Sequence, residues 1–279
     1  MEQITERIAG VSLSTVLLVL VVFSAVRLAL QSARATLLRA IADLLESAIL
    51  AIALVFLVLR PFVVQSYFIP SGSMRPTLWE GDRILVNKWL FRTRAPQFGE
   101  VVVFRAPRDA DPEEKEFIKR VVGLPGDRIE VSAGCVVVGD TIYTRSEIRA
   151  TLGESLSVDQ AADTANLPPL RLTSDALWLG DRRILPSEFA RAANHPAQRV
   201  EIHPGRVLRN GQMLMECYVT EDPQYEMGPR VVPPGEVFVM GDNRNQSLDS
   251  HIWGCLPTSR VIGRAEMVFW PPSHARRIE

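Results

Sequence analysis

The stretch EFIKRVVGLPGD, residues 116–127, shows the strand pattern that recurs in the part of the chain after two N-terminal apolar runs. Its first eight residues suit a β-strand, and the Leu-Pro-Gly-Asp sequence that follows stops the strand. Because side chains alternate along a strand, Phe117, Lys119 and Val121 share one face while Arg120 lies on the other. A lysine on an apolar strand face is the unusual feature of this segment.

Five further short runs resemble this strand in being rich in Val, Ile and Phe and bounded by Gly, Pro or Asp. They read RILVNKW, GEVVVFRA, DRIEV, GEVFVMGD and RAEMVFW. Outside the two N-terminal apolar runs no long helical period appears, so the sequence predicts a mostly β, antiparallel fold. We expect one β domain formed by residues 63–134 and 206–279, with residues 135–205 as an inserted subdomain containing a short helix near PSEFARAA.

The N-terminal part carries two apolar runs, at about residues 10–30 and 44–62. The first is close to the ~20 residues that a helix needs to cross a bilayer. A cleaved signal peptide is the alternative for this run, but MEQITER before it has two acidic residues and only one arginine. We therefore predict that residues 1–62 are a retained membrane anchor with two transmembrane helices.

The loop between these runs carries Arg34 and Arg39, with Arg27 at its edge. The positive-inside rule places such a loop in the cytoplasm, and the chain after the second run on the opposite side. A lipid bilayer is accordingly an expected partner.

The composition excludes some classes of function. The formal net charge of -1 gives no basic field for nucleic acid. The cysteines are Cys135, Cys217 and Cys255, an odd number that defines no disulfide framework. No group of His, Cys or Asp has metal-ligand spacing, so we expect neither a metal nor a cofactor.

The stretch IPSGSMRPTL, residues 69–78, has the properties of a tight turn around Ser73. Pro70 and Pro76 stiffen its flanks, and Gly72 allows close backbone approach. A serine becomes a nucleophile only with a base in reach. The GxSxG pattern is absent and the four histidines are scattered, so lysine is the remaining candidate for that base.

Lys119 is the best candidate among three lysines, because Lys88 and Lys115 stand among polar residues and are expected to be solvated. An apolar strand face removes water from the amine, which lowers its pKa and allows it to accept a proton. Arginine could not do this. A strand lysine that simply extends to solvent is the alternative.

The polar stretch GDNRNQSLDSHIWG, residues 241–254, follows a predicted strand. Such stretches are often turns, but a dense set of Asp, Asn, Ser and Arg also suits residues that orient a base.

Together these segments resemble type I signal peptidases. SGSMRPTL is similar to the nucleophile motif of that family, GDRILVNK to the block after it, KRVVGLPGD to the lysine motif and GDNRNQSLDSHIWG to the last motif. The resemblance covers residues 60–127 and 206–270, and the stretch between varies within the family.

The resemblance implies that Ser73 is the nucleophile and Lys119 the general base. It also implies an oxyanion hole made by the Ser71 hydroxyl and the Ser73 amide. Ser247 matches a serine that orients the lysine, and Asp249 matches an acid in a structural ion pair near the site.

We predict Arg120 as the partner of Asp249, with Gly241 and Asp242 as further supporting residues. The chain departs from the family pattern at Asn245, where Asp is common, and at His251, where Arg is common. The second departure puts the ion pair of Asp249 in doubt.

The implied fold is an antiparallel β catalytic domain of signal-peptidase type. The implied function is that of a serine endopeptidase in the plasma or inner membrane, with two spans and an extracytoplasmic catalytic domain, which removes signal peptides from preproteins. A membrane-anchored β domain without catalysis is the competing hypothesis. A self-cleaving repressor-type Ser–Lys protease would need a DNA-binding domain, which two membrane spans exclude.

The substrate is expected to bind as an extended strand beside a sheet edge, near Phe68, Ile69, Pro70 and Met74. Aromatic residues such as Phe68, Trp79 and Trp270 are expected either at the membrane interface or in the core, with neither favoured.

Overall fold

The structure is a computed structural model of residues 1–279, and it describes residues 13–31, 36–56, 64–155 and 168–279. The chain divides into two compact units. The first contains Met1–Ile69, Gly81–Ala95 and Ile262–Ile278, and the second contains Pro70–Glu80, Pro96–Val261 and Glu279.

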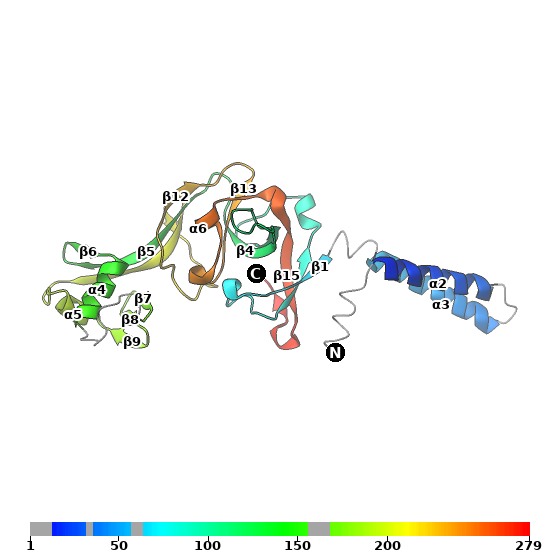
Figure 1. Ribbon diagram of the computed structural model, residues 1–279, viewed down its shortest axis with the longest axis horizontal. Coiled ribbons are helices and arrows are strands. Elements are labelled where there is room, and N and C mark those ends of the chain that lie inside the picture. The colour runs from blue at the N-terminus through cyan, green and yellow to red at the C-terminus, as the bar shows by residue number, and fades with distance from the viewer. Residues whose placement is uncertain (1–12, 32–35, 57–63, 156–167) are drawn as a thin grey trace. The chain divides into compact units, whose positions relative to one another are not determined.

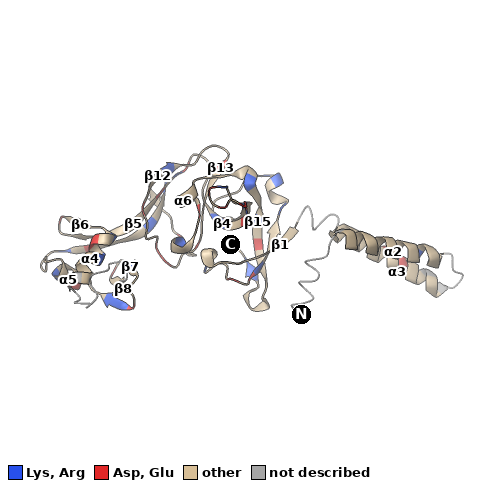
Figure 2. Ribbon diagram, viewed as in Figure 1, with Lys and Arg blue, Asp and Glu red and all other residues tan. Residues whose placement is uncertain are grey.

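The first unit begins with two helices that lie side by side, α2 (Leu13–Gln31) and α3 (Thr36–Ala53) (Figure 1). Only 6% of the stretch Ser14–Gln31 is buried, although it is strongly apolar. Among the described residues α2 is the one helix long and apolar enough to cross a membrane. Figure 2 shows few charged residues along these two helices.

The structure does not confirm a second transmembrane helix. α3 begins at Thr36, eight residues before the predicted span, and so includes Arg39, Asp43 and Glu46. With these three charges α3 is not a candidate span by length and composition in the way α2 is, and Glu46 pairs with Arg27 of α2. The last part of the predicted span, residues 57–62, lies outside the described residues.

The first unit also contains a small antiparallel sheet. β1 (Val64–Phe68) pairs with β2 (Arg83–Asn87), β2 pairs with β15 (Val261–Trp270), and β15 pairs with β16 (Arg276–Arg277). Single 3₁₀ turns occur at η3 (Leu90–Arg92) and η7 (Pro272–His274).

In the second unit, four strands form the sheet that positions the site. Its order is β3 (Val101–Arg105), β4 (Glu116–Gly123), β13 (Glu236–Met240) and β14 (Leu256–Pro257), with each pair antiparallel. Four consecutive residues of β3 and four of β13 are buried, as expected for strands covered on both faces.

A second antiparallel sheet contains the two longest strands of this unit, β5 (Arg128–Val138) and β10 (Val200–Arg209), which pair along most of their length (Figure 1). β11 (Gln212–Met213), β12 (Met227–Val231) and β6 (Thr141–Tyr143) complete it. Its core includes Ile129, Val131, Val207 and Phe238.

The segment between β6 and β10 shares an apolar core with β5 and β10, and this core includes Ile148, Leu177 and Phe189. Its elements are α4 (Arg145–Ser155), α5 (Pro186–Ala192), and a sheet of β7 (Leu170–Leu172), β8 (Leu177–Leu179) and β9 (Arg182–Ile184). The short helix predicted near PSEFARAA is α5. The prediction of a mostly antiparallel β fold is confirmed, whereas α4 and the β7–β9 sheet had no clear sequence signal.

Candidate active site

Ser73 lies in a single 3₁₀ turn, η2 (Gly72–Met74), in the second unit. The Arg75 amide donates to the Gly72 carbonyl at 3.1 Å, and the Leu78 amide donates to the Met74 carbonyl at 2.9 Å. Met74 and Leu78 are fully buried and anchor the turn. The turn is therefore fixed by packing below it, while Ser73 itself is half-buried.

Lys119, on β4, brings its amine to this serine. Its Nζ atom lies 2.8 Å from Ser73 Oγ and 2.9 Å from the Ile118 carbonyl oxygen. The side chain is only 4% exposed. Burial lowers the pKa of the Lys119 amine to about 8, even though the carboxylates of Asp249 and Asp242 act to raise it.

The loop that follows β13 holds the serine turn through three hydrogen bonds. The Asn243 amide donates to the Ser73 carbonyl at 3.1 Å, and Asn243 Nδ2 donates to the Gly72 carbonyl at 3.1 Å. Thr77 donates its hydroxyl proton to Asp242. The position of Ser73 thus depends on a loop about 170 residues further along the chain.

Gly241 permits this close packing. A Cβ atom there would lie 2.3 Å from Ser247 Oγ and 2.5 Å from the Ser73 carbonyl oxygen. Both distances are far below van der Waals contact, so any side chain would separate the loop from the serine turn. The same geometry brings Ser247 close to the site, where its hydroxyl is buried without a hydrogen-bond partner among the described residues. Its orienting role remains a prediction.

The ion pair predicted between Arg120 and Asp249 is wrong. Arg120 instead forms a two-pronged pair with Asp242, with Nε to Oδ1 at 2.9 Å and Nη2 to Oδ2 at 2.8 Å. The strand register explains this choice, because Arg120 is opposite Met240 and Asp242 follows two residues later. Both side chains are almost fully buried.

Asp249 has other partners. It caps α6 (Ser250–Trp253), and its Oδ2 accepts from the Gly241 amide at 2.9 Å. Its Oδ1 lies 2.7 Å from His251 Nδ1 and accepts from the His251 amide at 3.2 Å. His251 is therefore the side-chain partner of Asp249, at the position where the sequence had left that partner in doubt.

A buried hydrogen-bond network that the sequence did not indicate also stabilises the loop after β13. Arg244, in the 3₁₀ turn η5 (Arg244–Gln246), binds both oxygens of Glu216 at 2.6 Å and donates to the Gly241 carbonyl at 3.1 Å. Tyr218 donates to Glu216 at 2.7 Å, and its ring lies 3.8 Å below the Arg120 guanidinium. Of these residues, only Arg244 could have been found from the sequence, because it lies inside the polar stretch at residues 241–254.

Asn245 also has a defined role in the structure. Its side-chain oxygen accepts from the Gln224 amide at 2.9 Å, and its Nδ2 donates to the Asp222 carbonyl at 3.1 Å and to Glu221 at 3.3 Å. An aspartate could not donate to these acceptors. The departure from the family motif at this position thus fits the neighbouring loop.

The residues predicted to contact substrate fall into two groups. Phe68 is 60% exposed, and Pro70 and Ser71 are also exposed. Ile69 and Met74 are buried, so contrary to the prediction their side chains present no surface to a substrate. Ser71 is extended and makes no capping hydrogen bond, which leaves its hydroxyl available at the start of the turn.

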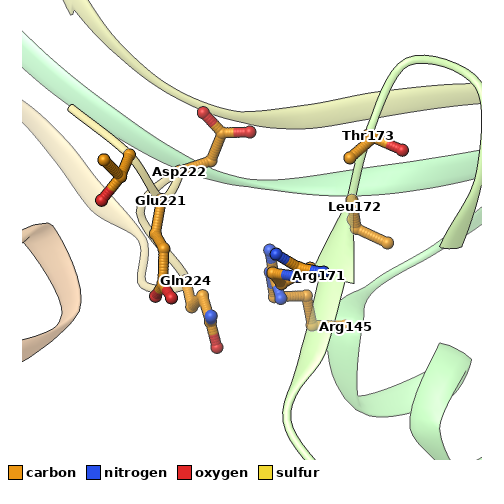
Figure 3. Close-up of a pocket in the computed structure, with 8 residues that line it drawn as sticks. Arg145, Arg171, Leu172, Thr173, Glu221, Asp222 and Gln224 are labelled. Atoms are coloured by element: carbon orange, nitrogen blue, oxygen red, sulfur yellow. The ribbon is translucent and has the colours of Figure 1, made fainter. Parts of the chain in front are cut away.

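A separate cavity of about 70 Å³ lies between α4, β7 and the loop at residues 220–224 (Figure 3). Arg145 and Arg171 extend toward Glu221 and Gln224 across it. In the described part of the chain, no cluster of three or more His, Cys, Asp or Glu side chains could hold a metal ion.

The comparisons with known proteins agree on one family. A family model described as "Signal peptidase, peptidase S26" matches residues 41–184 and 191–270. The chain is 34% identical over 230 residues to a probable signal peptidase I-1 of Synechocystis sp., a match that covers 81% of each protein. It is 33% identical over 216 residues to a probable signal peptidase I-2 of the same organism, covering 76% of this chain and 66% of that protein.

A solved structure of a signal peptidase I from Enterococcus faecalis is 20% identical and has a TM-score of 0.28, covering 61% of this chain and 97% of that one.

The pairing of Arg120 with Asp242 makes a prediction about stability. Arg120→Met leaves a buried carboxylate without its counter-ion, which typically costs about 3–5 kcal/mol of unfolding free energy. Urea unfolding of the purified protein measures the loss. Arg183→Met is the matched control, because Arg183 pairs with Asp175 at an exposed site and should contribute little. Equal losses in the two variants would contradict the pairing as a stabilising feature.

Proposed function

The chain belongs to the signal peptidase family, peptidase S26, and is a serine endopeptidase; on that premise we propose that it cleaves signal peptides from exported preproteins at a membrane surface, with Ser73 as nucleophile and Lys119 as general base. The observation that carries this proposal is the 2.8 Å separation of Lys119 Nζ and Ser73 Oγ, together with the burial of the amine.

The first step is attack of Ser73 Oγ on the scissile carbonyl carbon. Lys119 accepts the hydroxyl proton, which requires a neutral amine. Its lowered pKa of about 8 leaves an appreciable neutral fraction at physiological pH. Lys119 then transfers this proton to the leaving amine, and later activates the water that hydrolyses the acyl-enzyme.

The developing negative charge on the substrate oxygen requires hydrogen-bond donors. We assign this role to the Ser71 hydroxyl and the Ser73 amide, which stand at the start and centre of the turn. The exposed position of Ser71 and its lack of a capping bond support the assignment. A donor of this kind contributes about 10²–10³ in rate.

The remaining site residues hold Ser73 and Lys119 in position relative to each other. Asp242 and Gly241 tie the loop to the serine turn, and Arg120 neutralises Asp242. The Ser247 hydroxyl is buried without a hydrogen-bond partner among the described residues, which is consistent with a role in orienting the amine. Asp249 orders the start of α6.

The membrane part of the proposal rests on α2. A core helix would be buried, yet several of its large apolar side chains are more than 60% exposed, among them Leu18, Val21 and Leu28. Lipid would cover such a surface. Arg27, Arg34 and Arg39 would orient the region after α2 toward the cytoplasm, and a second span would then return the chain to the other side.

The substrate is expected to approach as an extended strand beside the serine turn, with its apolar signal segment in the bilayer. Phe68 and Trp79, which is 41% exposed, are available for such contacts or for the membrane interface. A binding module without catalysis would have no need for a desolvated lysine at a serine hydroxyl, so we favour the enzyme.

Removing either member of the pair tests the proposal. Ser73→Ala and Lys119→Ala should abolish cleavage of a model preprotein by the detergent-solubilised full chain, because nucleophile and base act as one unit. Lys115→Ala is the matched control, since Lys115 is exposed and pairs with Glu113. Retained cleavage in either site variant, with the variant correctly folded, would overturn the mechanism.

The rate should also depend on pH in a defined direction. Lys119 must be neutral, so kcat/KM is expected to rise about tenfold per pH unit below pH 8 and to level off above its pKa of about 8. Single-turnover cleavage between pH 5.5 and 10 measures this without interference from product release. A profile that stays flat through this range would exclude a lysine base with that pKa.

A further inference from the structure

His251 binds a carboxylate whose charge acts on the proposed base. The His251 Nδ1 atom is 2.7 Å from Asp249 Oδ1, and Asp249 is completely buried while the His251 side chain is 14% exposed. The other described donors to Asp249 are the backbone amides of Gly241 and His251. The imidazole is therefore the one side chain in the described part of the chain that donates to this buried charge.

The imidazole also stacks against an aromatic ring. The Tyr225 ring stacks on it with centroids 4.0 Å apart and planes at 19°. Burial, and next the Asp249 charge, raise the pKa of the Tyr225 phenol, so this neighbour remains neutral. From β12, Arg230 donates to the carbonyl of Ser250, the residue before His251, at 3.3 Å. The described partners of the imidazole itself are thus one carboxylate and one neutral phenol ring.

Asp249 connects this imidazole to Lys119. Its negative charge raises the pKa of the Lys119 amine and so opposes the effect of burial. Through Oδ2 it also fixes the Gly241 amide, and Gly241 packs against the Ser73 carbonyl. A positive charge on residue 251 would offset the field of Asp249, whereas a neutral side chain there would leave that field in place.

We propose that His251 is a positioning residue for the Lys119 base: it holds the Asp249 carboxylate, and the charge carried by the side chain at position 251 sets how strongly that carboxylate acts on the amine. This proposal rests on the proposed function, because it concerns how readily Lys119 becomes neutral.

Two variants at position 251, one with a charged side chain and one with a neutral side chain, test the proposal. His251→Arg carries a permanent charge, and His251→Gln carries none. We expect the midpoint of the rise of kcat/KM with pH to be lower in the Arg variant than in the Gln variant by about half to one pH unit. At pH 7 the Arg variant should then be about 3–10 times faster, and the two should converge above pH 10.

Coinciding midpoints would overturn the proposal. So would a rate difference of the same factor at every pH, because that indicates a purely structural role. His203→Gln is the matched control, since His203 lies on β10 with a carboxylate, Glu201, 3.9 Å away, and should leave the midpoint unchanged. Thermal unfolding checks that each variant is folded. If His251→Arg or His251→Gln does not fold, His251→Lys and His251→Asn provide the same comparison between a charged and a neutral side chain.

The two proposals can fail separately. A wild-type protein whose cleavage rate does not rise with pH contradicts the lysine mechanism. A wild-type protein with the expected rise, beside Arg and Gln variants that share one midpoint, contradicts only the role of His251.

Discussion

The site depends on one constraint, which is that an amine normally charged at neutral pH lies out of water within hydrogen-bond distance of a serine hydroxyl. Burial of Lys119 disfavours its ammonium form, and only then can the amine receive a proton from Ser73. β4 supplies this burial because it lies between β3 and β13. Arginine could not meet the same constraint, since its guanidinium remains protonated in proteins.

Two buried carboxylates near this lysine would restore its positive charge if they were left without partners. The structure gives each carboxylate partners of its own. The Arg120 guanidinium binds both oxygens of Asp242, and Asp249 is bound by His251 and by two backbone amides. Both carboxylates are therefore satisfied locally, which lets the loop after β13 be both highly polar and deeply buried.

The sequence alone predicted those features of the structure that depend on a local pattern of residues. The strand at residues 116–123 and the turn around Ser73 follow from alternation and from Gly and Pro positions. The partner of Arg120 was not predictable, because Asp242 and Asp249 lie in the same loop and only the register of β4 and β13 decides between them. Glu216 lies 28 residues from Arg244, and nothing in the sequence indicates that they pair.

The charge state of Lys119 can be measured directly, because the chain has only three lysines. Lysine labelled with ¹³C at the ε position gives one NMR signal per residue, and the signal absent from a Lys119→Met sample belongs to Lys119. The account predicts that this signal titrates with a midpoint of about 8. A midpoint at or above about 10.4, the ordinary lysine value, would contradict it.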